Sequence, residues 1–156
     1  MANLEESTFR EVGKSDTKMH GHPALILAGA KELEQFAVRE LMNVNGLGEI
    51  PVVVVTRETI DTTLNEVAQL PDGTGFGVEE ELPRAIIMSG LTEAQFHTMM
   101  DSYRKIGLPR PLWASVTPTS EAWTIKALLI ELLNENRELR EASRRKAEAE
   151  NAENQD

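Results

Sequence analysis

Ala24-Leu25-Ile26-Leu27-Ala28 is an apolar run that ends directly at Gly29, and the prediction of the fold begins from it. A second run, Ala85-Ile86-Ile87-Met88-Ser89, ends at Gly90 in the same way. Continuous apolar runs of this length are typical of strands that are buried on both faces. Two further strands are predicted, over 51–56, where β-branched residues follow Pro51, and over 112–117.

A helical pattern follows each predicted strand. The first covers 31–45 and ends near Gly46, and a shorter one covers 59–70. The third begins at Thr92 with Gln95 three residues later, which is the spacing of a capping box. The fourth begins at Thr119 or Ser120. Each helix is expected to turn its apolar positions toward the core. In chain order of the four helices, these positions are Leu33, Phe36, Ala37, Leu41 and Val44; Ile60, Leu64 and Val67; Phe96, Met99, Met100, Tyr103 and Ile106; and Ile125, Leu128, Leu129 and Leu132.

The order strand, helix, strand, helix therefore occurs twice, and an offset of 61 residues aligns the two halves without a gap. The shared residues gather at strand ends and helix ends, as in Gly29 and Gly90 or Thr63 and Thr124. We predict an α/β fold of duplicated βαβα units, with a four-stranded sheet in the order 2-1-3-4 and parallel strands within each half. The relative direction of the halves stays open.

Three further segments complete the predicted organisation. Residues 1–22 form a disordered or loosely packed leader, and 23–133 form the α/β domain, with halves 23–70 and 84–133. Between them, 71–83 is glycine-rich and then acidic, which predicts a flexible linker. Residues 134–156 continue the last helix as a long, charged, solvated tail with i,i+4 pairs of opposite charge.

Composition excludes several classes of protein. Hydrophobic residues make up 40% and charged residues 27% of the chain, which are ordinary globular values. No cysteine is present, so there is no disulfide framework, thiolate metal site or cysteine nucleophile. The net charge of −10 argues against a nucleic-acid or membrane partner. Without a secretory signal or an apolar stretch that could span a membrane, we expect a cytoplasmic protein.

The predicted ligand-binding corner is Thr117-Pro118-Thr119-Ser120, between the fourth strand and the last helix, together with Trp123. Open α/β sheets bind ligands where strands end and helices begin, and hydroxyl and backbone N–H groups there could hold a small anion or a nucleotide. The alternative is that Thr119 or Ser120 only caps the helix, because no Lys or Arg lies in this segment. Trp123 and Trp113 serve either as core anchors or as a stacking platform.

No arrangement of residues predicts catalysis or a metal site. His20 and His22 could contribute two ligands, with Asp16 nearby, but zinc needs a third or fourth ligand, so we interpret both as loop histidines. The sequence has no serine-histidine-aspartate arrangement and no phosphate-binding glycine motif. We therefore expect no catalytic residues, no metal and no cofactor.

The second half, from about 84 to 137, resembles a bacterial family catalogued as domain of unknown function 3783. The resemblance rests on five features: Ile86 to Glu93, Gly107-Leu108-Pro109, Thr117-Pro118-Thr119, Trp123-Thr124, and the Leu-Leu-x-Glu-Leu-Leu run at 128–133. The family tends to have asparagine where this chain has Ser120. The resemblance implies an uncharacterised bacterial protein and carries over no activity or site residues.

Together these observations favour a non-enzymatic protein-binding or regulatory module. It would use a sheet edge or the C-terminal helix, the latter also being able to self-associate through Leu132, Leu133 and Leu139. Two alternatives stay open: a binder of a small anion or nucleotide at the Thr117–Ser120 corner, and an enzyme whose site forms between subunits.

Overall fold

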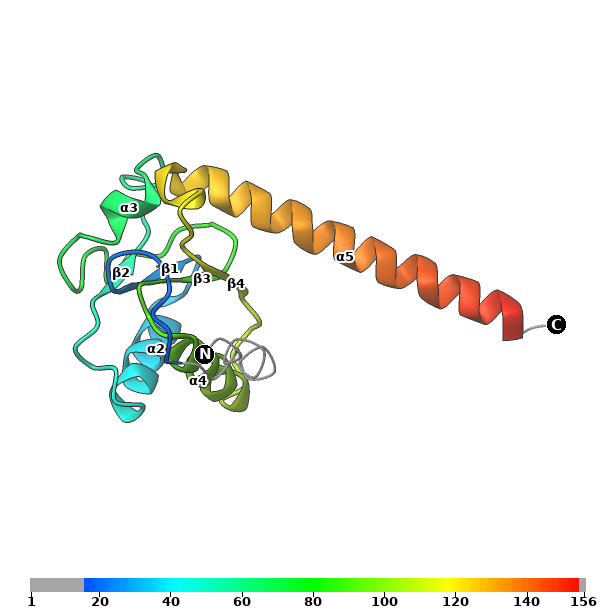
Figure 1. Cartoon of the computed structure of the whole chain (residues 1–156), viewed down its shortest axis with the longest axis horizontal. Coiled ribbons are helices and arrows are strands. Elements are labelled where there is room, and N and C mark those ends of the chain that lie inside the picture. Colours follow the sequence, from blue (N-terminus) through cyan, green and yellow to red (C-terminus); the bar gives the residue numbers. More distant parts are fainter. Residues whose placement is uncertain (1–15, 155–156) are drawn as a thin grey trace, which may run out of the picture.

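The computed structural model describes residues 16–154 and contains one mixed four-stranded sheet (Figure 1). Its strands are β1 (Ala24–Ala28), β2 (Val52–Val54), β3 (Ala85–Ser89) and β4 (Leu112–Ser115), in the order β2-β1-β3-β4. β1 is parallel to β2 and β3 is parallel to β4, whereas β1 and β3 are antiparallel. The predicted order 2-1-3-4 is confirmed, and the two halves run in opposite directions.

Helices cover both faces of this sheet (Figure 1). α2 (Glu32–Val44) and α4 (Glu93–Lys105) pack on one face. α3 (Leu64–Val67) and the first turns of α5 (Ile125–Asn154) pack on the other, and the short 3-10 helix η2 (Ser120–Ala122) precedes α5. The fold is therefore the predicted α/β arrangement with a long C-terminal helix.

The two central strands supply the core. Every residue of β1 and β3 is buried, because successive side chains point to opposite faces and both faces are covered by helices. In β1, Leu25 and Leu27 face α2 and α4, while Ile26 faces α3 and α5. Complete burial of each such side chain contributes about 1.5–3 kcal/mol to stability. This confirms the interpretation of the apolar runs.

Positions 61 residues apart meet where the halves join. Ile26 lies opposite Ile87 at the centre of the β1–β3 pair, and Thr63 forms an isolated antiparallel bridge with Thr124. Around this bridge, the N–H of Leu64 donates to the carbonyl of Trp123 at 2.9 Å, and the N–H of Ile125 donates to the carbonyl of Thr62 at 3.0 Å. The two halves are thus joined at a pair of equivalent strands and a pair of equivalent helix starts.

Glycine is required at the end of each central strand. Gly29 has φ +70° and lies against the carbonyls of Leu82 and Pro83, which lead into β3. Gly90 has φ +69° and lies against the carbonyl of Gly21 in the segment that leads into β1. A side chain at either glycine would meet backbone atoms, and both φ values disfavour other residues. The segment preceding each half therefore crosses closely behind the first strand of the other half.

The inward face of α2 differs from the prediction. Leu33, Phe36 and Val44 are 82%, 54% and 67% exposed, whereas the helix buries Glu34, Gln35, Val38, Leu41 and Met42. Gln35 can be buried because each of its polar atoms is bonded. Its amide donates to the carbonyls of Ala30 at 3.1 Å and Val78 at 3.0 Å, and accepts from the N–H of Gly77 at 2.7 Å. The predicted stripe on this helix is wrong at Leu33, Phe36 and Val44 and confirmed at Leu41, and Ala37 is partly buried.

α4 follows its prediction more closely. The Thr92 hydroxyl accepts from the N–H of Gln95 at 3.1 Å, and the Gln95 side chain accepts from the N–H of Thr92 at 2.8 Å, which confirms the capping box. Met99 and Tyr103 are buried and Phe96 packs against the core. The end of the predicted stripe is not inward, since Ile106 is 42% exposed.

The two helices on the opposite face begin later than predicted. α3 spans only Leu64–Val67 instead of 59–70, and α5 begins at Ile125 instead of at Thr119 or Ser120. Both starts lie at the join between the halves, where Thr63 and Trp123 have extended backbone and the carbonyls of Ile60 and Thr62 accept hydrogen bonds from the first turn of α5. The inward positions Leu64, Val67, Ile125, Leu128 and Leu129 are confirmed, and Leu132 is partly buried.

Residues 72–74 lie along the outer edge of β2. The N–H of Gly73 donates to the carbonyl of Val52 at 2.8 Å, and the N–H of Val54 donates to the carbonyl of Thr74 at 2.8 Å. The Asp72 carboxylate accepts from the N–H of Val52, also at 2.8 Å. Residues 72–74, within the segment 71–83 that the sequence predicts to be a flexible linker, are thus bonded to the sheet and cover an edge strand.

The end of the predicted leader is also bonded to the domain. The N–H of Met19 donates to the carbonyl of Leu91 at 2.8 Å, the N–H of Gly90 donates to the carbonyl of His20 at 3.0 Å, and Lys18 forms a bridge with Thr92. Residues 1–15 of that predicted leader lie outside the described residues.

Substitutions on α2 test which face is buried. We expect Gln35→Leu to lower the free energy of unfolding by about 1–3 kcal/mol, because it leaves the N–H of Gly77 and two carbonyls without partners. Leu33→Gln, two residues away and exposed, should change it by less than about 0.5 kcal/mol. Urea unfolding of both variants checks this. Destabilisation by Leu33→Gln with no effect of Gln35→Leu would show that the helix faces the other way.

Candidate functional site

The predicted corner after β4 is closed by its own hydrogen bonds. The N–H of Ser120 donates to the Thr117 hydroxyl and the N–H of Thr117 donates to the Ser120 hydroxyl, each at 3.0 Å. The Thr117 hydroxyl also donates to that of Ser120 at 3.1 Å. Ser120 is 6% exposed, and the Thr119 side chain makes no capping bond. The predicted alternative that Thr119 or Ser120 caps the last helix is therefore wrong, because Thr117 and Ser120 close the turn before α5 and the Thr124 hydroxyl caps the helix itself.

The N-terminus of α5 next to this corner is also occupied. The N–H groups of Ile125 and Lys126 donate to the carbonyls of Thr62 and Ile60, and those of Ala127 and Leu128 donate to the hydroxyl and carbonyl of Thr124. An anion at a helix N-terminus needs free N–H groups. Because these four already have acceptors, a ligand role for Thr117, Thr119, Ser120 and Trp123 stays a prediction that the geometry does not favour.

The two tryptophans do not form one platform. Trp123 has extended backbone before α5 and packs on the α3–α5 side of the sheet. Trp113 packs on the opposite, α2–α4 side, with its ring centroid 5.6 Å from that of Tyr103 in an edge-on contact and 6.3 Å from that of Phe96. Sequence analysis placed both at one corner because they are close along the chain. In the structure, Trp113 of β4 and Trp123 of the loop before α5 lie on opposite faces of the sheet.

At the carboxyl ends of both parallel strand pairs, where open α/β sheets bind ligands, several backbone N–H groups are bonded to other parts of the chain, although a pocket of about 390 Å³ lined by Arg57 and Glu80 remains at the first of these ends. In the first half, the Glu79 carboxylate accepts from the N–H of Glu32 at 2.8 Å and the Glu80 carboxylate accepts from the N–H of Arg57 at 2.9 Å. In the second half, the carbonyl of Thr17 accepts from the N–H of Glu93 at 3.2 Å. Backbone donors that could hold an anionic ligand are thus bonded to carboxylates and carbonyls of the protein.

The histidines of the predicted loop lie at the second of these ends. The His20 ring is 2.6 Å from the Glu121 carboxylate, which ties residues 16–22 to η2. Within residues 16–154, no three side chains of His, Asp or Glu come together in a way that could hold a metal ion. The same described residues include no helix that is long and apolar enough to cross a membrane.

Among residues 16–154, the most buried ion pair joins the two halves. Arg84 donates two hydrogen bonds to the Glu34 carboxylate, at 2.9 and 2.8 Å, and the N–H of Lys31 donates a third at 3.1 Å. Hydrogen bonding from Arg84 outweighs the effect of burial and holds the pKa of Glu34 below its ordinary value. The charged groups of Glu34 and Arg84 are hydrogen-bonded to each other, so we infer that the pair stabilises the fold and does not bind a ligand.

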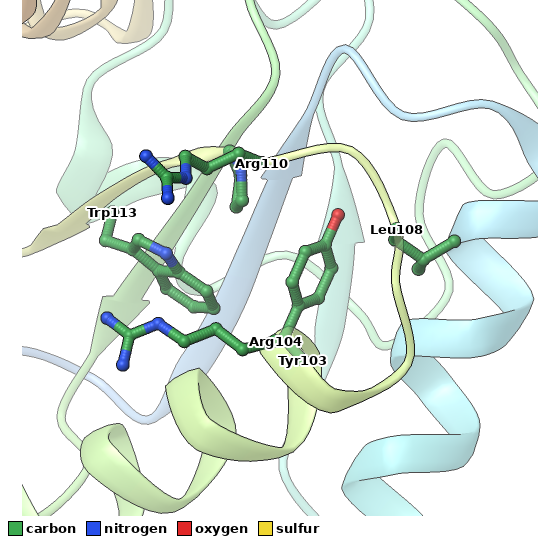
Figure 2. Close-up of a pocket in the computed structure, with 6 residues that line it drawn as sticks. Tyr103, Arg104, Leu108, Arg110 and Trp113 are labelled. Carbon is green, nitrogen blue, oxygen red and sulfur yellow. The ribbon is translucent and has the colours of Figure 1, made fainter.

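A pocket that sequence reasoning missed lies beside β4. It has a volume of about 580 Å³, and Figure 2 shows the side chains of Arg104 and Arg110 extending past the two sides of the Trp113 indole. Tyr103 lies beside the indole, with its hydroxyl donating to the carbonyl of Pro109 at 2.7 Å. Burial raises the pKa of Tyr103. The signal that could have found this pocket is the cluster of cations at 104–110 in a strongly acidic chain.

The two edges of the sheet differ. Residues 72–74 cover β2, but no segment within 16–154 pairs with the outer side of β4. In the first half, Pro71 follows α3 and the chain turns back over the edge, whereas Leu132, 61 positions later, lies inside α5. The second half continues as a helix instead of returning, and its edge strand stays open.

An apolar groove of about 310 Å³ runs beside the first turns of α5. Its aliphatic lining includes Ile130 and Leu133, which are 50% and 44% exposed, next to Ile60, Leu82 and Pro83. Beyond this groove α5 leaves the domain, as Figure 1 shows, and Leu139 on that part is 68% exposed. Apolar side chains are thus exposed where α5 departs from the sheet.

The Glu34–Arg84 pair gives a prediction about pH. We expect Glu34→Gln to lower the free energy of unfolding by about 1.5–3 kcal/mol at neutral pH, since hydrogen bonds between charged groups are lost. The pKa of Glu34 is lowered in the folded protein, so its contribution is present above pH 4.5 and disappears as the pH falls through the lowered value. The difference between wild type and variant, measured by urea unfolding, should therefore shrink in acid.

Glu40→Gln, at an exposed position of the same helix, serves as the control and should change stability little at any pH. A Glu34→Gln effect that stays constant through the acid range would contradict the assigned pair.

The corner gives a second prediction. Ser120→Ala should lower the free energy of unfolding by about 1 kcal/mol, because the hydrogen bonds with Thr117 are lost, and Thr119→Ala should have little effect. Inorganic phosphate should leave the Tm of the wild type unchanged in a thermal-shift assay. A rise in Tm with phosphate that Ser120→Ala abolishes would instead establish anion binding at this corner.

Comparison with known proteins gives one match. Residues 84–139 match the family model described as Domain of unknown function (DUF3783), which confirms the resemblance of the second half. The matched segment includes β3, α4, β4 and η2 and ends within α5. No curated protein and no solved structure gives a significant match. The second half of the chain, which carries the β4 pocket and the start of α5, thus matches a family whose function is unknown.

Proposed function

We propose that this protein is a non-enzymatic protein-binding module whose α/β domain holds α5 in place for a partner protein. The observation that carries the proposal is that α5 is much longer than the part of it that packs against the domain. The helix has 30 residues, or about 45 Å, but its core contacts end near Leu132. The remaining turns expose nearly all of their surface.

Energetics also favour a partner for this helix. Its outer turns have pairs of opposite charge at i,i+4, each worth only a few tenths of a kcal/mol, so alone they are marginally stable. Exposed Ile130, Leu133 and Leu139 offer apolar contacts to another helix. A second copy paired along the whole helix is disfavoured, because beyond Leu139 only alanines supply apolar residues and a coiled coil needs more.

The bonded carboxyl ends of the sheet support a non-enzymatic role. Where a nucleotide or substrate would approach, the N–H groups of Glu32 and Arg57 are bonded to Glu79 and Glu80, and the N–H of Glu93 to Thr17. A cytoplasmic, bacterial setting and an origin of the two halves by duplication belong to the same proposal. The anion-binding and intersubunit-enzyme alternatives stay predictions without a specific observation in their favour.

Truncation tests the proposal. Proteins captured by the full chain should be lost on deletion of 134–156, and the double variant Leu133→Glu, Leu139→Glu should lose them as well. The double variant Ala147→Glu, Asn151→Glu adds the same charge farther along exposed helix and should retain them. Quantitative capture by mass spectrometry, with circular dichroism to check folding, measures this.

If the truncated chain captured the same proteins at the same level, α5 would not be the binding element. Sedimentation of the full chain alone addresses self-association: a dimer that Leu133→Glu, Leu139→Glu converts to a monomer would favour a second copy as the partner.

A further inference from the structure

The outer side of β4 has hydrogen-bonding groups directed away from the sheet. The N–H groups of Leu112 and Val116 donate to the carbonyls of Arg84 and Met88, so these even-numbered positions bond to β3. Because the ladder alternates, Trp113 and Ser115 direct their N–H and carbonyl groups outward. Exposed strand edges of this kind pair with extended segments of other proteins.

The α4 side of this edge is cationic. Arg104 and Arg110 extend past the two sides of Trp113 in the pocket of Figure 2. Arg104 is paired only with Asp101, at 3.6 Å and with 64% of each side chain exposed, and Arg110 forms no ion pair within the described part of the chain. Weak or absent pairing leaves both guanidinium groups able to bind a carboxylate, which they match in geometry and charge.

The opposite side of the edge is apolar. Leu112 and Ala114 point to the α3–α5 side, where both are partly buried together with Leu132 of α5. Successive side chains of an added strand point to opposite faces of the sheet. A strand bound here would therefore place alternate residues beside the arginines and the intervening residues beside these aliphatic side chains.

We propose that the open edge of β4 binds an extended acidic segment of a partner protein by strand addition. Its carboxylates lie beside Arg104 and Arg110, over the Trp113 indole, and alternate with aliphatic residues on the α5 side. Charge complementarity selects this occupant, because Arg104 and Arg110 line the pocket beside this edge and lack strong ion-pair partners among the described residues. The inference rests on the proposed protein-binding function but uses a surface distinct from the outer turns of α5.

Fluorescence anisotropy with labelled peptides tests this inference on the full chain. A peptide of alternating glutamate and valine should bind at least about tenfold more tightly than one of alternating lysine and valine, since charge-assisted hydrogen bonds differ between them. N-methylation of its backbone on one edge should abolish binding, and added salt should weaken it.

Charge reversal identifies the residues. The double variant Arg104→Glu, Arg110→Glu should reverse the preference in favour of the lysine peptide. Arg140→Glu, Arg144→Glu changes the net charge equally on exposed turns of α5 and should leave binding unchanged. Deletion of 134–156 should also preserve peptide binding, so failure of the α5 proposal and failure of this inference give different results.

Three outcomes would overturn the inference. One is no binding of the glutamate peptide at millimolar concentration, and another is equal binding of the N-methylated peptide. The third is a dimer in sedimentation that Ser115→Pro, which removes an outward N–H, converts to a folded monomer; a second copy would then cover this edge.

Discussion

The antiparallel pairing of β1 with β3 is the interaction on which the rest of the structure depends. Ile26 faces Ile87 at its centre, and the Thr63–Thr124 bridge repeats the join outside the sheet. Because the second half is reversed, the carboxyl ends of the two parallel pairs lie at opposite ends of the sheet. The segment that leads into the first half crosses behind Gly90, and the segment that leads into the second half crosses behind Gly29. Each segment also accepts hydrogen bonds from backbone N–H groups of the other half that a ligand would otherwise use.

What distinguishes the halves is the path taken after the second strand and helix of each. After α3 the chain turns at Pro71 and Asp72 bonds to the edge of β2, whereas α5 continues past Leu132 without a turn. The lack of a turn after Leu132 therefore has two consequences: a long helix leaves the domain, and β4 keeps an open edge. The β4 edge and the first turns of α5 lie in the segment that matches the family model, whereas the outer turns of α5 extend beyond it.

Sequence patterns were sufficient where structure is local. The apolar runs and the glycines after them predicted the central strands, and the Thr92–Gln95 capping box predicted the start of α4, because neighbouring residues determine these features. Prediction failed where distant segments meet. Gln35 is buried only because residues 77 and 78 supply its partners, and α5 begins at Ile125 because residues 60 and 62 bond its first turn. The β4 pocket was missed because Arg104, Arg110 and Trp113 come from a helix, a loop and a strand.

Amide hydrogen exchange can show whether the chain bonds its own ligand-facing N–H groups and the β2 edge while the β4 edge and the outer turns of α5 stay open. In the monomeric full chain, the amides of Val52, Val54, Ile125 and Lys126 should be protected to nearly the global stability, because each has an acceptor within the fold. Those of Trp113, Ser115 and residues beyond 140 should exchange rapidly. Protection of Trp113 and Ser115 equal to that of Val52 and Val54 would contradict the account.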